Sequence, residues 1–396
     1  MKIARIDTHW IAVPFDHGGP ASTGFGGRAW ADMNTLIIEV ETDCGIIGYG
    51  EIFGHNAIPS ARSALETMIA PFAIGQDARA IQPLMQEIQR TNHNFGRYGQ
   101  SMFAISGLDT ALWDIAGKAA GLPLWQLLGG TASQTIPAYA SLMRYAEPEV
   151  VEERTAAAVA EGYKYVKLHE RTPEAVGAAR DGAGAAPRIM VDVNCPWTPS
   201  EACSMAAAFE PYDIHWLEEP VWPPENFDGL AEVRSSGLMD IAAGENASTA
   251  WEFQQMLRAG AVDWAQPSVA KVGGVTEARK ISTLCEAANV GFAPHSPYFG
   301  PGFVATLHVV AAHTGQKAPI ERLYGHMEAS LYGDLINPDS DGLYHLPDGP
   351  GLGIDPDPNV MRGLYAGLDR DVLMKLPEPQ DRIFKLSGGG IGEIPA

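Results

Sequence analysis

The chain has 396 residues, of which 46% are hydrophobic and 19% charged; this balance is typical of a globular protein and excludes a disordered or fibrous one. Its 27 basic and 48 acidic residues give a formal charge of −21, which repels nucleic acid and anionic membranes, so neither is expected as a partner. The four cysteines show no CxxC spacing, and neither a signal peptide nor an apolar run of about 18 residues is found. We therefore expect a reduced, cytoplasmic protein.

The first third of the chain predicts a small sheet followed by helices. Residues 1–13 and 34–51 are expected to be strands of a hairpin or meander, because β-branched residues alternate along TLIIEVETDCGIIGYGE. The Gly-rich stretch 16–32 between them is long enough to be a mobile loop. From about 58 to 128 the hydrophobic residues recur with the period of helices, and Gly121 is expected to end the long, Ala-rich one.

From about residue 135, short apolar strands alternate with Ala-rich helices in seven or eight steps. This rhythm is typical of parallel strands with crossover helices, either in a (β/α) barrel or in a doubly wound sheet. No GxGxxG follows the first strand, and polar residues recur at successive strand ends, where a barrel builds its active site. The pattern favours an α/β barrel over 131–335. The Gly-, Pro- and Asp-rich segment 336–396 is expected to return to the N-terminal domain.

Acidic residues end three successive predicted strands: Asp192 in IMVDVN, Glu218 in IHWLEEP and Glu245 in IAAGEN. Their spacings of 218 − 192 = 26 and 245 − 218 = 27 residues each correspond to about one βα unit. One such acid is more often solvated or a helix N-cap, but three at this regular spacing indicate converging carboxylates. Converging carboxylates require a cation, and a set of oxygen ligands suits Mg²⁺.

One βα unit earlier, YKYVKLHE places Lys167 and His169 two residues apart, so both side chains are expected to point into the barrel. They could be a solvated lysine and a structural histidine. A lysine inside a parallel strand is unusual, however, and near a metal and another cation either residue can be held neutral and act as a base. His295, in GFAPHS, is expected to be an acid/base group, and Glu321, in APIERL, ends the predicted final strand.

Together these motifs resemble the mandelate racemase subgroup of the enolase superfamily. The resemblance covers most of the chain and rests on SGLDTALWDIAGKAAGLPLWQLLGG, Lys167-x-His169, the three acids, LEEP, GEN, KVGG and LPDGPGLGID. It implies a modified (β/α)8 barrel with an α+β capping domain made of 1–130 and the C-terminal segment. It also implies that the loop at 16–32 and the turn near Ile52–Asn56 select the substrate. Its partners would be a small carboxylate substrate and further copies of the chain in a homo-oligomer, with an octamer as one candidate.

Two positions depart from the family pattern. The commonest second base motif is Lys-x-Lys, whereas this chain has His169 in the last position. In the mandelate racemase pattern the catalytic histidine pairs with an aspartate on the preceding strand, where this chain has Ser268. We therefore expect His295 to lack the partner that fixes its tautomer and raises its basicity, which argues against symmetric two-base racemisation. The residues expected to bind the substrate are Asn194, Ser268 and Lys271, a lysine shared by both branches of the family.

The expected chemistry is removal of the proton next to a substrate carboxylate. Mg²⁺, a lysine and, if it is protonated, Glu321 would stabilise the resulting charge. The preferred interpretation is a sugar-acid dehydratase, in which Lys167 or His169 takes the proton, His295 protonates the leaving hydroxyl, and the product is a 2-keto-3-deoxy acid. The alternatives are a racemase, an epimerase or a lactone cycloisomerase of the same fold, and a non-catalytic paralogue that only binds metal and sugar acid.

Overall fold

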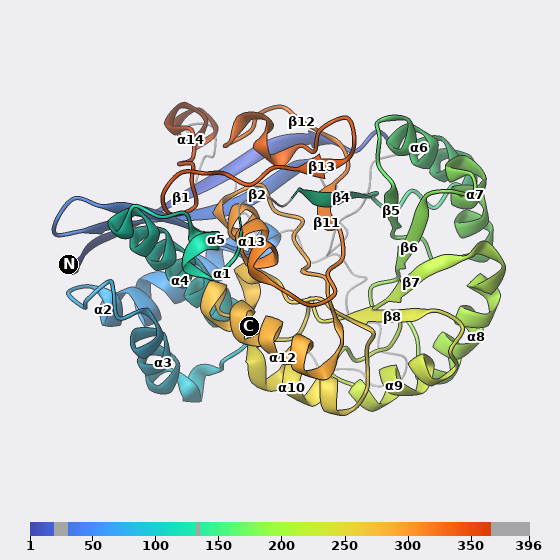
Figure 1. Ribbon diagram of the computed structural model, residues 1–396, viewed down its shortest axis with the longest axis horizontal. Coiled ribbons are helices and arrows are strands. Elements are labelled where there is room, and N and C mark those ends of the chain that lie inside the picture. The colour runs from blue at the N-terminus through green and yellow to red at the C-terminus, as the bar shows by residue number, and fades with distance from the viewer. Residues whose placement is uncertain (20–30, 132–134, 366–396) are drawn as a thin grey trace, which may run out of the picture.

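The computed structural model describes residues 1–19, 31–131 and 135–365 (Figure 1). Figure 1 shows a sheet and helices on the left and a ring of strands wrapped by helices on the right. Most of the predicted loop at 16–32 lies outside the described residues, as does the chain after 365. Within the described ranges, no helix combines the length and apolarity that crossing a bilayer requires.

The sheet at the left is an antiparallel meander, which confirms the strand prediction for this region. Its strands are β1 (Ile3–Asp16), β2 (Asp32–Thr42) and β3 (Ile47–Ile52), and β12 (His326–Met327) joins from the far end of the chain beside β1. Within the C-terminal segment, α14 (Pro358–Tyr365) contacts β1, so this helix lies on the N-terminal sheet.

Helices cover one face of this sheet. They are η1 (His55–Ala57), α1 (Ile58–Ala64), the π-helical η2 (Leu65–Ile69), α2 (Ala70–Ala73), α3 (Ile81–Thr91), η3 (His93–Phe95), α4 (Gln100–Ala120) and α5 (Leu124–Leu127). The long α4 is buried because it packs on β2 and β3 and also contacts the barrel. Gly50 allows this approach, since a Cβ there would overlap the carbonyl oxygen of Gly107. Gly121 ends α4 in the left-handed conformation, as predicted.

The second unit is a closed barrel in which eight parallel strands are described. In ring order they are β11 (Ile320–Leu323), β4 (Ile136–Ser141), β5 (Tyr165–Leu168), β6 (Arg188–Asp192), β7 (Ile214–Glu218), β8 (Asp240–Ala243), β9 (Trp264–Ala265) and β10 (Gly291–Phe292). Backbone hydrogen bonds from Phe292 N to Gln316 O and from Ala318 N to Phe292 O close the ring at 2.8 and 3.0 Å. The predicted barrel is therefore confirmed, and β13 (Leu343–Tyr344) pairs antiparallel with β4.

Helices between successive strands wrap the barrel: α6 (Pro148–Ala160), α7 (Pro173–Ala183), α8 (Pro199–Phe209), α9 (Phe227–Ser235), α10 (Thr249–Arg258), α11 (Val269–Val272), α12 (Gly274–Ala288) and α13 (Pro301–Ala312). Short 3-10 turns η4 (Glu210–Tyr212) and η5 (Gly333–Ile336) complete the connections. Each crossover returns the chain to the opposite end of the barrel, so the carboxyl ends of all strands meet at one mouth. Below that mouth, buried Tyr139, Met190, Trp216 and Trp264 fill the interior.

Candidate active site

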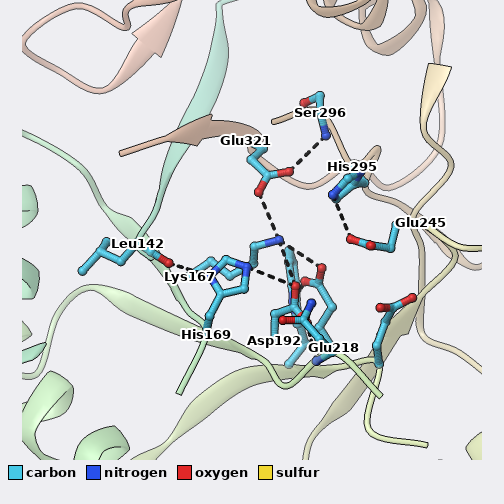
Figure 2. A network of polar contacts seen from close by, with 12 residues as sticks. Leu142, Lys167, His169, Asp192, Glu218, Glu245, His295, Ser296 and Glu321 are labelled. Atoms are coloured by element: carbon cyan, nitrogen blue, oxygen red, sulfur yellow. Dashed lines mark hydrogen bonds and ion pairs between the residues drawn. The ribbon is translucent and has the colours of Figure 1, made fainter. Parts of the chain in front are cut away.

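Three carboxylates converge at the barrel mouth. Asp192 and Glu218 are the last residues of β6 and β7 and lie opposite each other in register, and Glu245 follows β8. One carboxylate oxygen from each lies within 4.8 Å of the others (Figure 2). Burial, together with the charges of Asp192 and Glu321, raises the pKa of Glu218 to about 7 although Lys167 opposes the shift. This crowding of negative charge among hard oxygen donors is what a divalent cation relieves, so the site can hold a metal.

Lys167 lies at the centre of this cluster. Its Nζ is 3.0 Å from Glu218 Oε1, 3.1 Å from Glu321 Oε1 and 3.6 Å from Asp192 Oδ2 (Figure 2). Burial favours the neutral amine, but the charges of Glu218 and Glu321 outweigh it and raise the pKa of Lys167 well above its ordinary value. Lys167 is therefore not a solvated surface lysine. The carboxylates hold it as an ammonium ion.

His169 lies beside Lys167, just after β5. Its Nδ1 is 2.5 Å from the carbonyl oxygen of Leu142, and its Nε2 is 3.3 Å from Asp192 Oδ2. Because a carbonyl can only accept, this contact requires a proton on Nδ1 and fixes the tautomer. Burial opposes a charge on the ring, but the hydrogen bond and charge of Asp192 outweigh it and raise the pKa of His169. Nε2 therefore faces the carboxylate cluster.

His295 lies on the other side of the cluster from His169 (Figure 2). Its Nε2 is 2.8 Å from Glu245 Oε2, and its Nδ1 is 2.6 Å from the hydroxyl oxygen of Ser268. The expectation that His295 lacks a partner is therefore wrong as far as contact is concerned, because Ser268, in the position of the usual aspartate, contacts its ring. A hydroxyl orients the ring as a carboxylate would, but it does not add a negative charge.

Glu321 and Asn194 both contact other groups of the site. Glu321 is the second residue of β11, and its Oε2 accepts a hydrogen bond from Ser296 N at 3.0 Å. Burial alone would raise the pKa of Glu321, but the charge of Lys167 lowers it below its ordinary value, which does not favour the protonated form. Asn194 donates from its backbone N and from Nδ2 to Asp192 Oδ1, both at 2.9 Å. It therefore orients a candidate metal ligand.

The N-terminal unit supplies aromatic residues to the rim of the site. Lys271, in α11, is buried with its Nζ 4.9 Å from the ring centre of Phe53 and 5.9 Å from that of Phe103. The ring of His55 packs against Phe53. Burial, and next the positive charges of His295 and Lys271, lower the pKa of His55 to about 4. The sequence indicated this turn only through the family resemblance, because no periodicity or spacing relates it to the barrel.

Family models match both parts of the chain. Residues 6–129 match the N-terminal domain of mandelate racemase and muconate lactonizing enzyme, and residues 149–360 match the model described as enolase C-terminal domain-like. The chain belongs to the enolase superfamily. Within it, the chain falls in the group of mandelate racemase and muconate lactonizing enzyme, which confirms the resemblance read from the motifs.

Named relatives of this enolase-superfamily chain include an isomerase and a lyase. It is 32% identical to the D-galactarolactone cycloisomerase of Agrobacterium fabrum, over 96% of this chain and 100% of that one. It is 31% identical to the arabinonate dehydratase of Saccharolobus solfataricus, over 83% and 89% of the two chains. A racemase from Streptomyces coelicolor solved with bound magnesium superimposes with a TM-score of 0.78 at 28% identity, over 91% and 99%.

The enolase-superfamily chain is thus an enzyme, a lyase or an isomerase. The alternative of a non-catalytic paralogue is set aside on this ground. The structure brings together at one mouth the residues that the sequence singled out: Lys167, His169, Asp192, Asn194, Glu218, Glu245, Ser268, Lys271, His295 and Glu321.

Proposed function

We propose that the enzyme is a Mg²⁺-dependent dehydratase of sugar acids. The observation that carries this proposal is the placement of proton-transfer groups on both sides of one carboxylate cluster, with Lys167 and His169 on one side and His295 on the other (Figure 2). Removing water from a sugar acid requires a base at one carbon and an acid at the next. The names of relatives, among them arabinonate and D-gluconate dehydratases, support a sugar acid as substrate.

Asp192, Glu218 and Glu245 are the proposed ligands of the metal. Mg²⁺ bound there would offset the negative charge that develops on the substrate carboxylate as the adjacent proton leaves. Asn194 orients Asp192 through two hydrogen bonds, and Trp216 Nε1 donates to Glu218 Oε2 at 3.0 Å. Ligands held in this way keep their geometry when the substrate enters. The magnesium-bound relative from Streptomyces coelicolor supports the choice of metal.

The base is Lys167 or His169, since both reach the same side of the cluster. The charges of Glu218 and Glu321 hold Lys167 as an ammonium ion, and a metal ion held by Glu218 would weaken that electrostatic hold. Nε2 of His169 already faces the cluster because Nδ1 is bound to Leu142 O. Whichever group acts, it takes the proton from the carbon next to the carboxylate, and the electron pair of that C–H bond passes to the carboxylate.

His295 is the proposed acid. As the electron pair returns to form a carbon–carbon double bond, the neighbouring C–O bond breaks and His295 Nε2 gives its proton to the departing hydroxyl, so water leaves. The resulting enol tautomerises to a 2-keto-3-deoxy acid. Ser268 keeps Nε2 directed to the site through its contact with Nδ1.

A lactone cycloisomerase is the second candidate. It is favoured by the identity of 32% over nearly the whole chain with the galactarolactone cycloisomerase. The same α-proton abstraction serves this reaction, but the leaving group is then the ring oxygen of a lactone and no water is released. Racemisation and epimerisation require a base on each face of the substrate, and His295 has a neutral hydroxyl in place of the usual carboxylate.

The test is to screen sugar acids and their lactones with Mg²⁺ for keto-acid release and for uptake of deuterium from D₂O. Lys167→Ala should abolish both, or His169→Asn should if His169 is the base. His295→Asn should lower keto-acid release by about 10²–10⁴-fold while deuterium uptake continues. Keto-acid release at near wild-type rate by His295→Asn would contradict the assigned acid. An isomeric product without water loss would favour the cycloisomerase, and full turnover in excess chelator would exclude the metal.

A further inference from the structure

Two arginines lie at the mouth of the barrel on the side of the proposed base. Arg144 follows β4 by three residues, and Arg171 follows β5 by three residues. These strands are parallel neighbours, with Ser141 opposite Lys167 in register. Both arginines therefore lie in loops at the carboxyl end of the barrel, where the metal-site carboxylates also lie. Neither has a part in the proposed proton transfers.

Within the described ranges, the charges of the two guanidinium groups are not balanced by an ion pair. Among the described residues, no carboxylate lies within ion-pair distance of Arg144 or Arg171. Within the same part of the chain, Nε of Arg171 is buried and has no hydrogen-bond partner. Buried donors normally have a hydrogen-bond partner, so a bound ligand could supply the acceptor for this Nε.

Arg144 and Arg171 are close enough to repel each other. Burial, and next the positive charge of Arg144, lower the pKa of Arg171, whereas Asp192 and Cys195 act in the opposite direction. Arg171 is thus within electrostatic range of both Arg144 and the proposed metal ligand Asp192. An anion placed between the two guanidinium groups would remove their repulsion and accept from both, as carboxylate and phosphate oxygens do.

We propose that Arg144 and Arg171 bind an anionic group at the far end of the substrate. The preferred substrate is then a sugar acid with two anionic ends, either a dicarboxylic (aldaric) acid or a monocarboxylic acid phosphorylated at its other end. This inference rests on the proposed function, in which the first carboxylate binds at the metal site. A neutral hydroxyl at the far end would leave two like charges facing each other without an acceptor of opposite charge.

The first experiment compares hexonic acids, hexaric acids of the same configuration and the 6-phosphorylated hexonic acids. With the Mg²⁺-loaded enzyme, kcat/KM should favour one of the two doubly anionic series. Arg171→Gln and Arg144→Gln should each lower that preference by about 10- to 100-fold. Arg188→Gln, at the opposite end of the barrel, is the matched control and should keep the wild-type ratio. A preference for the phosphorylated series would identify phosphate as the anion, and one for the hexaric acids a second carboxylate.

The second experiment does not require turnover. Calorimetry measures binding of adipate and hexanoate, which have equal chain length and differ in the second carboxylate, to the Mg²⁺-loaded enzyme. Adipate should bind more tightly, and Arg171→Gln should remove the difference. An adipate preference that both arginine variants retain would overturn this inference. If no sugar acid reacts but the adipate preference is present and Arg171-dependent, the anion site stands and the proposed reaction fails. If the enzyme dehydrates hexonic acids but Arg144→Gln and Arg171→Gln keep the wild-type ratio of kcat/KM between the substrate series, only the anion site is overturned.

Discussion

At the scale of single residues, Ser268 is the unusual feature of this site. Its hydroxyl, at the position of the aspartate in the mandelate racemase pattern, lies 2.6 Å from Nδ1 of His295 and 3.2 Å from the carbonyl oxygen of His295. An aspartate would both orient the imidazole ring and place a negative charge beside it, whereas the serine hydroxyl only orients the ring. The ring is held in place, but nothing at Nδ1 stabilises a positive imidazolium.

Changing Ser268 should therefore alter the pH dependence of the enzyme. Ser268→Asp places a negative charge at Nδ1 and favours the protonated ring, so the alkaline limb of the keto-acid release profile should move upward by about one pH unit or more. Deuterium uptake through the His295 face should also rise. Ser268→Asn is the uncharged control and should leave the limb in place. Coincident profiles for the Asp and Asn variants would contradict this account.

A second prediction concerns the metal. Glu218→Gln replaces one ligand oxygen by an amide group and keeps the volume, so the enzyme should remain folded but lose Mg²⁺ affinity and activity. The measurement is the rise in melting temperature on adding Mg²⁺, which wild type should show and the variant should lose. Glu174→Gln, at an exposed position, is the control. A Mg²⁺-induced rise that survives in Glu218→Gln would remove Glu218 from the ligand set.

At the scale of elements, Glu51 joins the N-terminal sheet to the barrel. It lies on β3, where Oε1 accepts from the Thr35 hydroxyl at 2.5 Å and Oε2 accepts from the backbone N of Gly302 at 2.9 Å, at the start of α13. Burial raises the pKa of Glu51 from 4.5 to about 7, although these hydrogen bonds oppose the shift. The contact between the two units therefore contains a carboxyl group that titrates near neutrality.

Glu51 should make stability depend on pH. Between about 4.5 and 7 the folded protein keeps a proton that the unfolded chain releases, so stability falls as pH rises, by on the order of 3 kcal/mol in total. Glu51→Gln lacks this titration. The measurement is the melting temperature of Glu51→Gln minus that of wild type, both in chelator. This difference should increase from pH 5 to pH 8. Glu87→Gln, exposed on α3, is the control. A pH-independent difference between Glu51→Gln and wild type would show that Glu51 does not titrate in this range.

At the scale of the whole molecule, the cap and the barrel meet at the active-site mouth. Lys271 of the barrel lies against Phe53 and Phe103 of the cap, and α4 contacts α12. The rim of the site is therefore lined by residues of the N-terminal unit as well as of the barrel. The formal charge of −21 belongs to the whole chain, and Lys167 and the two arginines add local positive charge near the carboxylate cluster.

The last prediction is that the enzyme forms a homo-oligomer, as the family resemblance implies. Sedimentation equilibrium at micromolar concentration should give a multiple of the 42.4 kDa chain mass. Because copies with a charge of −21 repel one another, association should strengthen as salt rises to about 0.15 M, where the screening length is near 8 Å. A single species of monomer mass under all these conditions would contradict the prediction.

Much of the fold and the metal site could be predicted from the chain itself. Strand and helix periodicity identified the meander, the helices and the βα units, and the 26- and 27-residue spacings placed three acids at adjacent strand ends, because parallel strands share one direction. Side-chain pairing across the barrel depends on ring closure and rotamers, which no local pattern encodes. Only the tertiary structure could therefore show that Ser268 contacts His295, that Glu321 pairs with Lys167, and that Nε of Arg171 is buried without a partner.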